Sequence, residues 1–160
     1  MSRPAIDFLT FRLDVLNEQA KRHASQAYEE ACGVGLRELR VLRQAYAQPG
    51  ITQSEVAAGG YLEKTLVSKL VTSLVRRGLV RRQIGEEDAR WVQIFLTDEG
   101  RGIVQQCNRM GRQMDKAWLS ALEPAEVAMF EQVLAKLSAH LGQQAAKVRD
   151  KPAAKARKAA

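Results

Sequence analysis

The residues with the clearest capacity for chemistry lie at positions 63–77, where short hydroxyl side chains alternate with long cations. Apolar residues recur there at helical spacing, so the polar residues share the opposite face of a predicted helix. Such a face suits contacts to phosphates and to base edges. Gly78 should end the helix, because glycine readily adopts the left-handed conformation that follows a helix. The polar face carries Lys64, Thr65, Ser68, Lys69, Thr72 and Ser73.

A short, capped helix is predicted immediately before this segment. Thr52-Gln53-Ser54-Glu55 has the spacing of a capping box, in which Thr52 and Glu55 satisfy each other's backbone groups. This helix should cover residues 53–58 and end at Gly59 and Gly60. A short helix that braces a polar-faced helix suits the major groove of DNA, which admits one helix.

Two short strands should follow, over residues 79–84 and 91–96, with a charged hairpin tip between them. Residues 62–90 hold seven basic and four acidic side chains, a local charge of +3. The basic residues are Lys64, Lys69, Arg76, Arg77, Arg81, Arg82 and Arg90.

Longer helices are predicted on either side of this central region. The apolar spacing favours helices over residues 5–31 and 36–46, then over 97–121 and 125–146. The first is longer than an ordinary globular helix and carries a stripe of small residues, which is typical of packing on another helix or a second subunit. From Lys147 onward the chain is rich in lysine, arginine and alanine, and a disordered basic tail is expected.

Composition limits the partners and the class of activity. The 160 residues carry a net charge of +7, which favours a polyanion, either nucleic acid or an anionic membrane surface. No apolar run reaches the roughly 18 residues of a membrane span, and the N-terminus is unlike a signal peptide, so a cytoplasmic protein is expected. Cys32 and Cys107 suggest neither a zinc site nor a disulfide framework, and both are interpreted as packing residues. Because the motifs supply no nucleophile–base pair, phosphate loop or metal cluster, no enzyme and no cofactor are predicted.

These motifs, taken in order, resemble the MarR family of transcriptional regulators. The resemblance covers about residues 35–105 by motif and the flanking helices by arrangement. The residues that carry it are Ile51-Thr52-Gln53-Ser54-Glu55-Val56-Ala57, Lys64-Thr65-Leu66-Val67-Ser68-Lys69-Leu70-Val71, Leu74-Val75-Arg76-Arg77-Gly78-Leu79-Val80-Arg81-Arg82, Asp88-Ala89-Arg90 and Leu96-Thr97-Asp98-Glu99-Gly100.

The resemblance implies a mainly α fold, a winged helix-turn-helix with a two-stranded β wing and long N- and C-terminal dimerisation helices. The expected organisation is a dimerisation helix in 1–34, a DNA-binding lobe in 35–96, dimerisation helices in 97–146 and the tail in 147–160. The expected function is that of a homodimeric, sequence-specific repressor on double-stranded DNA with a pseudo-palindromic operator. Arg90, oriented by Asp88, would enter the minor groove, whose negative potential attracts arginine. The DNA-contact residues are expected to be Thr52, Gln53, Lys64, Thr65, Leu66, Ser68, Lys69, Thr72, Ser73, Arg76, Arg82, Asp88 and Arg90.

A small aromatic carboxylate is the effector that the resemblance implies, bound between the dimerisation helices and the DNA-binding lobe. His23 either packs in the core or faces such a cavity, and Arg12, Arg22, Arg37, Arg40 and Arg43 are candidate carboxylate partners. The site is predicted at Arg12, His23 and Arg43. Two alternatives stay open, a non-sequence-specific architectural DNA-binding protein and a regulator that senses redox state through a thiol.

Overall fold

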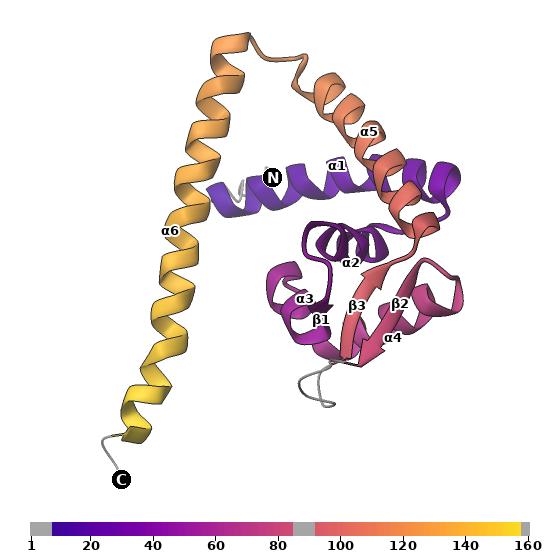
Figure 1. Ribbon diagram of the computed structural model, residues 1–160. Coiled ribbons are helices and arrows are strands. Elements are labelled where there is room, and N and C mark those ends of the chain that lie inside the picture. Colours follow the sequence, from indigo (N-terminus) through magenta and orange to yellow (C-terminus); the bar gives the residue numbers. More distant parts are fainter. Residues whose placement is uncertain (1–7, 85–91, 158–160) are drawn as a thin grey trace, which may run out of the picture. The chain divides into compact units, whose positions relative to one another are not determined.

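The computed structural model describes residues 8–84 and 92–157, with side chains to residue 144. The chain forms two compact units, Met1–Met114 and Asp115–Ala160. Along the chain the elements are α1 (Leu9–Cys32), α2 (Leu36–Ala47), β1 (Ile51–Thr52), α3 (Gln53–Gly60), α4 (Lys64–Arg76), β2 (Val80–Ile84), β3 (Val92–Leu96), α5 (Asp98–Leu119) and α6 (Pro124–Arg157) (Figure 1).

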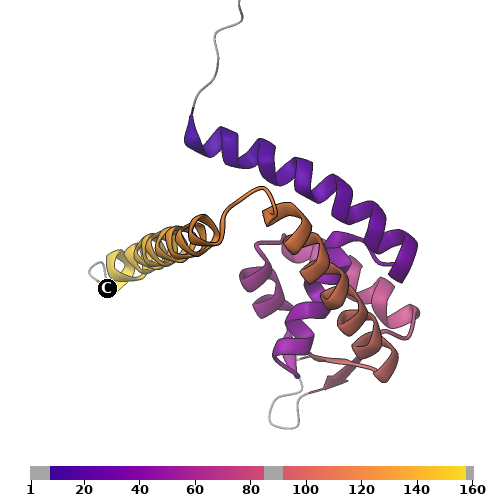
Figure 2. The same cartoon turned by 90° about the horizontal axis from the view of Figure 1, so that it is seen from above.

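The core of the first unit forms where α2, α3 and α4 pack together and against the sheet. Leu39 and Leu42 of α2, Leu74 of α4 and Ile94 of β3 are fully buried there. Only the C-terminal end of α1 joins this core, through Tyr28 and Cys32, and the rest of α1 extends past it (Figure 2). The predicted helices of this unit are confirmed. The ends of α2, α3, α4 and α5 differ from the predicted ends by at most two residues, and α1 begins at Leu9.

The sheet has three antiparallel strands in the order β1-β3-β2. The hairpin pairs Val80 with Leu96, as the two predicted strands require. The third strand extends the expected two-stranded wing, because Ile51 pairs with Ile94 on the other edge of β3. A strand of two residues is too short to produce a detectable alternation of apolar and polar residues.

The end of α3 differs from the prediction. Gly59 and Gly60 lie within the helix, and the left-handed residue that ends it is Tyr61, with φ of 50°. A Cβ atom on either glycine would come within 2.7 Å of the Gln44 side chain amide, which donates to the Val56 carbonyl over 3.2 Å. The two glycines therefore leave room for the Gln44 side chain between α2 and α3, and the left-handed conformation falls on the next residue.

The last helix also differs from the prediction, which ended it at Ala146 before a disordered tail. In the structure α6 continues to Arg157. Alanine, lysine and arginine are strong helix formers, so the composition that indicated a tail is also compatible with a continued helix. None of the helices in the described part of the chain is long and apolar enough to cross a membrane.

Two glycines near the start of α5 have opposite surroundings and offer a paired test of this packing. A Cβ atom on Gly100 would collide with the backbone carbonyl of Leu79, whereas a Cβ atom on Gly102 would meet nothing within 4 Å. Gly100→Ala should lower the free energy of unfolding by about 2 kcal/mol or more, since a backbone atom cannot move aside. Gly102→Ala should raise it by roughly 0.5–1 kcal/mol, because alanine favours the helix.

Urea denaturation followed by circular dichroism would measure both changes. Equal effects of the two substitutions would contradict the contact between α5 and Leu79.

The two cysteines lie in the core, where Cys107 is fully buried and Cys32 is 8% exposed. Burial raises the pKa of the Cys107 thiol to about 12, and a hydrogen bond with Cys32 acts in the same direction. Because the thiolate is the reactive form of cysteine, this environment favours packing over thiol chemistry. Cys32 in turn donates to the Met110 sulfur over 3.7 Å.

The raised pKa predicts a loss of stability in alkali. In the unfolded chain the thiol ionises near its ordinary value of 9.0, while in the folded chain it keeps its proton up to about pH 12. The contribution of this group to stability is therefore complete below pH 9 and falls as the pH rises from there, by about 1.4 kcal/mol per pH unit. Urea denaturation at pH 8, 9 and 10 should show a shallower pH dependence for Cys107→Ala than for the unsubstituted chain. Identical slopes would contradict the raised pKa.

Candidate nucleic-acid interface

One face of α4 is fully available to a partner. Val67, Val71 and Leu74 are buried, and Leu66 is half-buried. The residues on the opposite face are exposed, as the sequence predicts, and these are Lys64, Thr65, Ser68, Lys69, Thr72 and Arg76. Hence six of the predicted contact residues lie together on one side of one helix.

The cations on this face are available to bind an anion. No carboxylate among the described residues forms an ion pair with Lys64, Lys69 or Arg76. A shallow hollow of about 290 Å³ lies between Ser68, Lys69, Thr72, Ser73 and Arg76. Hydroxyl groups beside ammonium and guanidinium groups can bind phosphate oxygens and donate to base edges.

The capping box of α3 has the predicted geometry. The Thr52 hydroxyl accepts from the Glu55 N–H over 3.3 Å, and Glu55 accepts from the Thr52 N–H over 2.8 Å. Donation to the Glu55 carboxylate by the Thr52 N–H, and next by the Thr52 hydroxyl, lowers the pKa of Glu55 and favours its ionised form. The Thr52 hydroxyl also donates to Glu55 over 2.7 Å, so its main role here is to cap α3. Gln53, the other predicted contact on this helix, is half-buried.

The wing strand β2 adds one arginine to the α4 surface. The Arg82 Nη2 donates to the Thr72 hydroxyl over 2.8 Å, and that hydroxyl donates to the Ser68 carbonyl over 2.8 Å. Arg81 lies over the Phe95 ring, 4.6 Å from its centroid, because successive residues of a strand point to opposite faces. The structure therefore joins Arg82, but not Arg81, to the α4 face.

Some predicted contact residues lie elsewhere. Ser73 is half-buried, and its hydroxyl donates to Glu38 over 3.4 Å. Asp88 and Arg90 lie outside the described residues, so their predicted roles at the wing tip stay predictions.

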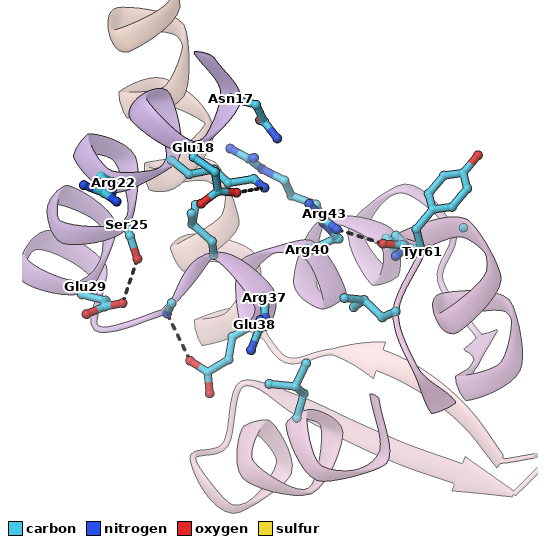
Figure 3. A pocket seen from close by; sticks show the side chains of 18 of the residues that line it. Asn17, Glu18, Arg22, Ser25, Glu29, Arg37, Glu38, Arg40, Arg43 and Tyr61 are labelled. Atoms are coloured by element: carbon cyan, nitrogen blue, oxygen red, sulfur yellow. Dashed lines mark hydrogen bonds and ion pairs between the residues drawn. The ribbon is translucent and has the colours of Figure 1, made fainter. Parts of the chain in front are cut away.

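A large open pocket of about 1230 Å³ lies in the first unit between α1, α2 and the turn that joins α3 to α4. Figure 3 shows Arg22, Arg37, Arg40 and Arg43 around it, with Tyr61 at one side. With Lys21 these make five basic side chains, against the carboxylates of Glu18, Glu29 and Glu38.

The predicted ligand residues are only partly brought together. Arg43 lines the pocket, where it donates to Asn108 over 2.9 Å and lies 5.7 Å from the centre of the Tyr28 ring. Arg12 and His23 are exposed and are not among the residues that line it. His23 borders a smaller hollow of about 270 Å³ on α1.

Sequence reasoning missed one pair of residues behind the α4 surface. Glu38 of α2 and Arg77 at the end of α4 form an ion pair with an N–O distance of 2.9 Å. They are 39 residues apart, so no helical or strand spacing in the sequence could have revealed the pairing.

Comparison with known proteins gives consistent results. Residues 33–90 match the model of the MarR family. The transcriptional regulator HosA of Escherichia coli O157:H7 is 25% identical over 122 residues, which cover 76% of this chain and 90% of HosA.

Solved structures show the same fold. A mutant MarR of Escherichia coli complexed with operator DNA has a TM-score of 0.73 at 24% identity, covering 81% of this chain and 92% of MarR. The PcaV transcriptional regulator of Streptomyces coelicolor, in complex with its natural ligand, has a TM-score of 0.70 at 23% identity, covering 86% of this chain and 97% of PcaV.

The family model spans the helices and the strand that form the exposed α4 surface, and the regulators that resemble the chain are not enzymes. Residues 33–90 of this chain thus match the MarR family, and the chain is similar in sequence to the transcriptional regulator HosA and in fold to the winged-helix regulator MarR.

Proposed function

We propose that the chain is a homodimeric repressor that binds a pseudo-palindromic operator and is released by a small aromatic carboxylate. The observation that carries the proposal is the exposed face of α4, where cations and hydroxyl groups lie together with Arg82 of the wing.

The α4 face provides both kinds of contact that operator recognition requires. Lys64, Lys69 and Arg76 are long enough to bind phosphates on either side of the major groove. Thr65 and Ser68 are short and lie between them, where a helix in the groove brings side chains to base edges. Arg90, beyond the described residues, would add a minor-groove contact from the wing tip. MarR, which resembles this chain in fold, has been solved with operator DNA.

A second copy of the chain would cover the exposed apolar side chains of the long helices. Isolated apolar residues on a surface are ordinary, but a row of them along a helix marks an interaction site. They are Phe8 just before α1 and Leu9, Phe11, Leu13, Val15 and Leu16 on it, and on α6 they are Met129, Val133, Leu134, Leu137 and Leu141. A symmetric dimer would place two α4 helices at half-sites about one DNA turn apart, roughly 34–36 Å.

Sequence-selective binding can be tested with the region upstream of the gene that encodes the chain, against a scrambled duplex at several salt concentrations. The unsubstituted chain should prefer the upstream duplex by about 10³-fold or more at physiological salt. Lys69→Gln should weaken binding to both duplexes and reduce the slope of log K against log salt by about one, because one phosphate contact is lost.

Lys136→Gln is the matched control, since Lys136 is exposed on α6 and should leave affinity and slope unchanged. Equal affinity of the unsubstituted chain for both duplexes would overturn the repressor and favour the architectural DNA-binding protein.

The pocket between α1 and α2 supports the proposed effector. Its arginines can pair with a carboxylate through two parallel hydrogen bonds, and Tyr61 supplies aromatic surface at the pocket wall. The ligand would shift the population toward a spacing of the two α4 helices that does not fit the operator. PcaV, which shares the fold, has been solved with its natural ligand.

Benzoate and its neutral analogue benzamide test carboxylate recognition. Millimolar benzoate should raise the midpoint of thermal unfolding and release operator DNA, whereas benzamide should do neither, because only benzoate can pair with the guanidinium groups. Arg37→Gln should weaken the response to benzoate by about tenfold, the effect of losing one charged hydrogen bond. Arg12→Gln, outside the pocket wall, should preserve it.

Responses of equal size to benzoate and benzamide would argue against a carboxylate effector.

A further inference from the structure

The C-terminal end of α4 is tied to the junction between α1 and α2 by a single arginine. Arg77 Nη1 donates to both carboxylate oxygens of Glu38, over 3.0 Å and 2.9 Å. Its Nη2 donates to the Gly33 carbonyl over 2.6 Å. One guanidinium group thus connects the last turn of α4 with the first turn of α2 and with the residue that ends α1.

Glu38 is the centre of this network, which we call the Glu38–Arg77 clamp. Besides Arg77 it accepts from the Gly35 N–H over 3.3 Å, at the N-terminus of α2, and from the Ser73 hydroxyl over 3.4 Å. The Glu38 side chain is 17% exposed and that of Arg77 is 34% exposed. Partial burial makes such a charged pair stronger and less sensitive to salt than an exposed one.

The junction that the clamp holds is itself fixed in the core. Val34, between Gly33 and Gly35, has no exposed surface. The clamp therefore connects the C-terminal end of α4 to a buried anchor. It also lies next to the pocket, since Gly35 and Glu38 are among the residues of the pocket wall.

The position of the clamp determines what it controls. The 13 residues of α4 span roughly 20 Å at 1.5 Å per residue. A tilt of about 5° around the clamped end would move the opposite end by about 1.7 Å at that length. Lys64 and Thr65 lie at that opposite end, and a displacement of this size separates a good hydrogen bond to a base edge from none.

We propose that Glu38 and Arg77 are positioning residues for DNA recognition, which set the angle of α4 and thereby the selectivity for the operator without touching DNA. This inference rests on the proposed function, in which α4 reads the operator. Arg76, the preceding residue, differs in kind, because it is exposed on the α4 face and forms no ion pair among the described residues.

These adjacent arginines give the experiment its matched control. The full chain and its Glu38→Gln, Arg77→Ala and Arg76→Ala variants would be titrated with the upstream duplex and the scrambled duplex at several salt concentrations. Glu38→Gln and Arg77→Ala should lower the ratio of the two affinities by about tenfold. The affinity for the scrambled duplex should stay within about twofold, and the salt slope should be unchanged. Arg76→Ala should weaken both affinities alike and reduce the salt slope by about one, as expected for a lost phosphate contact.

Two further variants separate positioning from general stability. The double variant Glu38→Gln/Arg77→Ala should lose no more selectivity than either single variant, because both remove the same interaction. Arg77→Lys should recover little, since a single ammonium nitrogen cannot take the places of both Nη1 at Glu38 and Nη2 at the Gly33 carbonyl. Glu38→Gln is nearly the same shape as the original residue, so it carries the test even if Arg77→Ala fails to fold.

The outcomes distinguish this inference from the proposed function. A lower unfolding midpoint with unchanged selectivity in Glu38→Gln would show that the pair only stabilises the fold. A reduced salt slope in Arg77→Ala would show instead that Arg77 contacts phosphate. Either result overturns the inference while the repressor stands, whereas equal binding of the unsubstituted chain to both duplexes overturns both.

Discussion

Three apolar side chains of α4, those of Val67, Val71 and Leu74, have no exposed surface, and their burial decides which side chains of that helix can meet a partner. Each contributes about 1.5–3 kcal/mol relative to exposure. Rotating α4 by one residue, roughly 100°, would expose them and press Ser68 and Thr72 against the core. The cost of that rotation far exceeds the energy of any single surface contact. The orientation of the DNA-facing side is therefore set from the inside of the molecule.

Local patterns in the sequence predicted the elements whose causes are local. The period of α4 and the capping box at Thr52 and Glu55 depend on residues three or four positions apart, and both are confirmed. The predicted end of α3 at Gly59 and Gly60 was wrong, because the contact that these glycines make is distant in the sequence. They lie within the helix and pack against the side-chain amide of Gln44, fifteen and sixteen residues earlier in the chain. Likewise β1 exists because Ile51 pairs with a strand more than 40 residues later.

The candidate site divides in the same way. A helical period predicts which residues share a face, and the exposed face of α4 follows from it. The period does not tell which face of α1 meets α2. The predicted ligand site therefore joins Arg12 and His23 to Arg43 on the basis of residue type alone. Of these three residues, only Arg43 lines the pocket. Charge composition reveals nothing about pairing either. In the sequence Arg77 is one more cation of the basic segment, whereas in the structure it forms an ion pair with Glu38.

The N-terminal half of α1 has a consequence for how the protein behaves on dilution. Residues 8–20 are exposed throughout, so tertiary packing within one chain adds little to this part of the helix. A segment of this length is only marginally helical by itself in water. In the proposed homodimer its order would come from the second subunit, and folding and association of this half would then form one equilibrium. Its helicity would depend on protein concentration, and the ensemble at nanomolar concentration, where DNA binding is usually measured, would differ from the ensemble at the micromolar concentrations of spectroscopy.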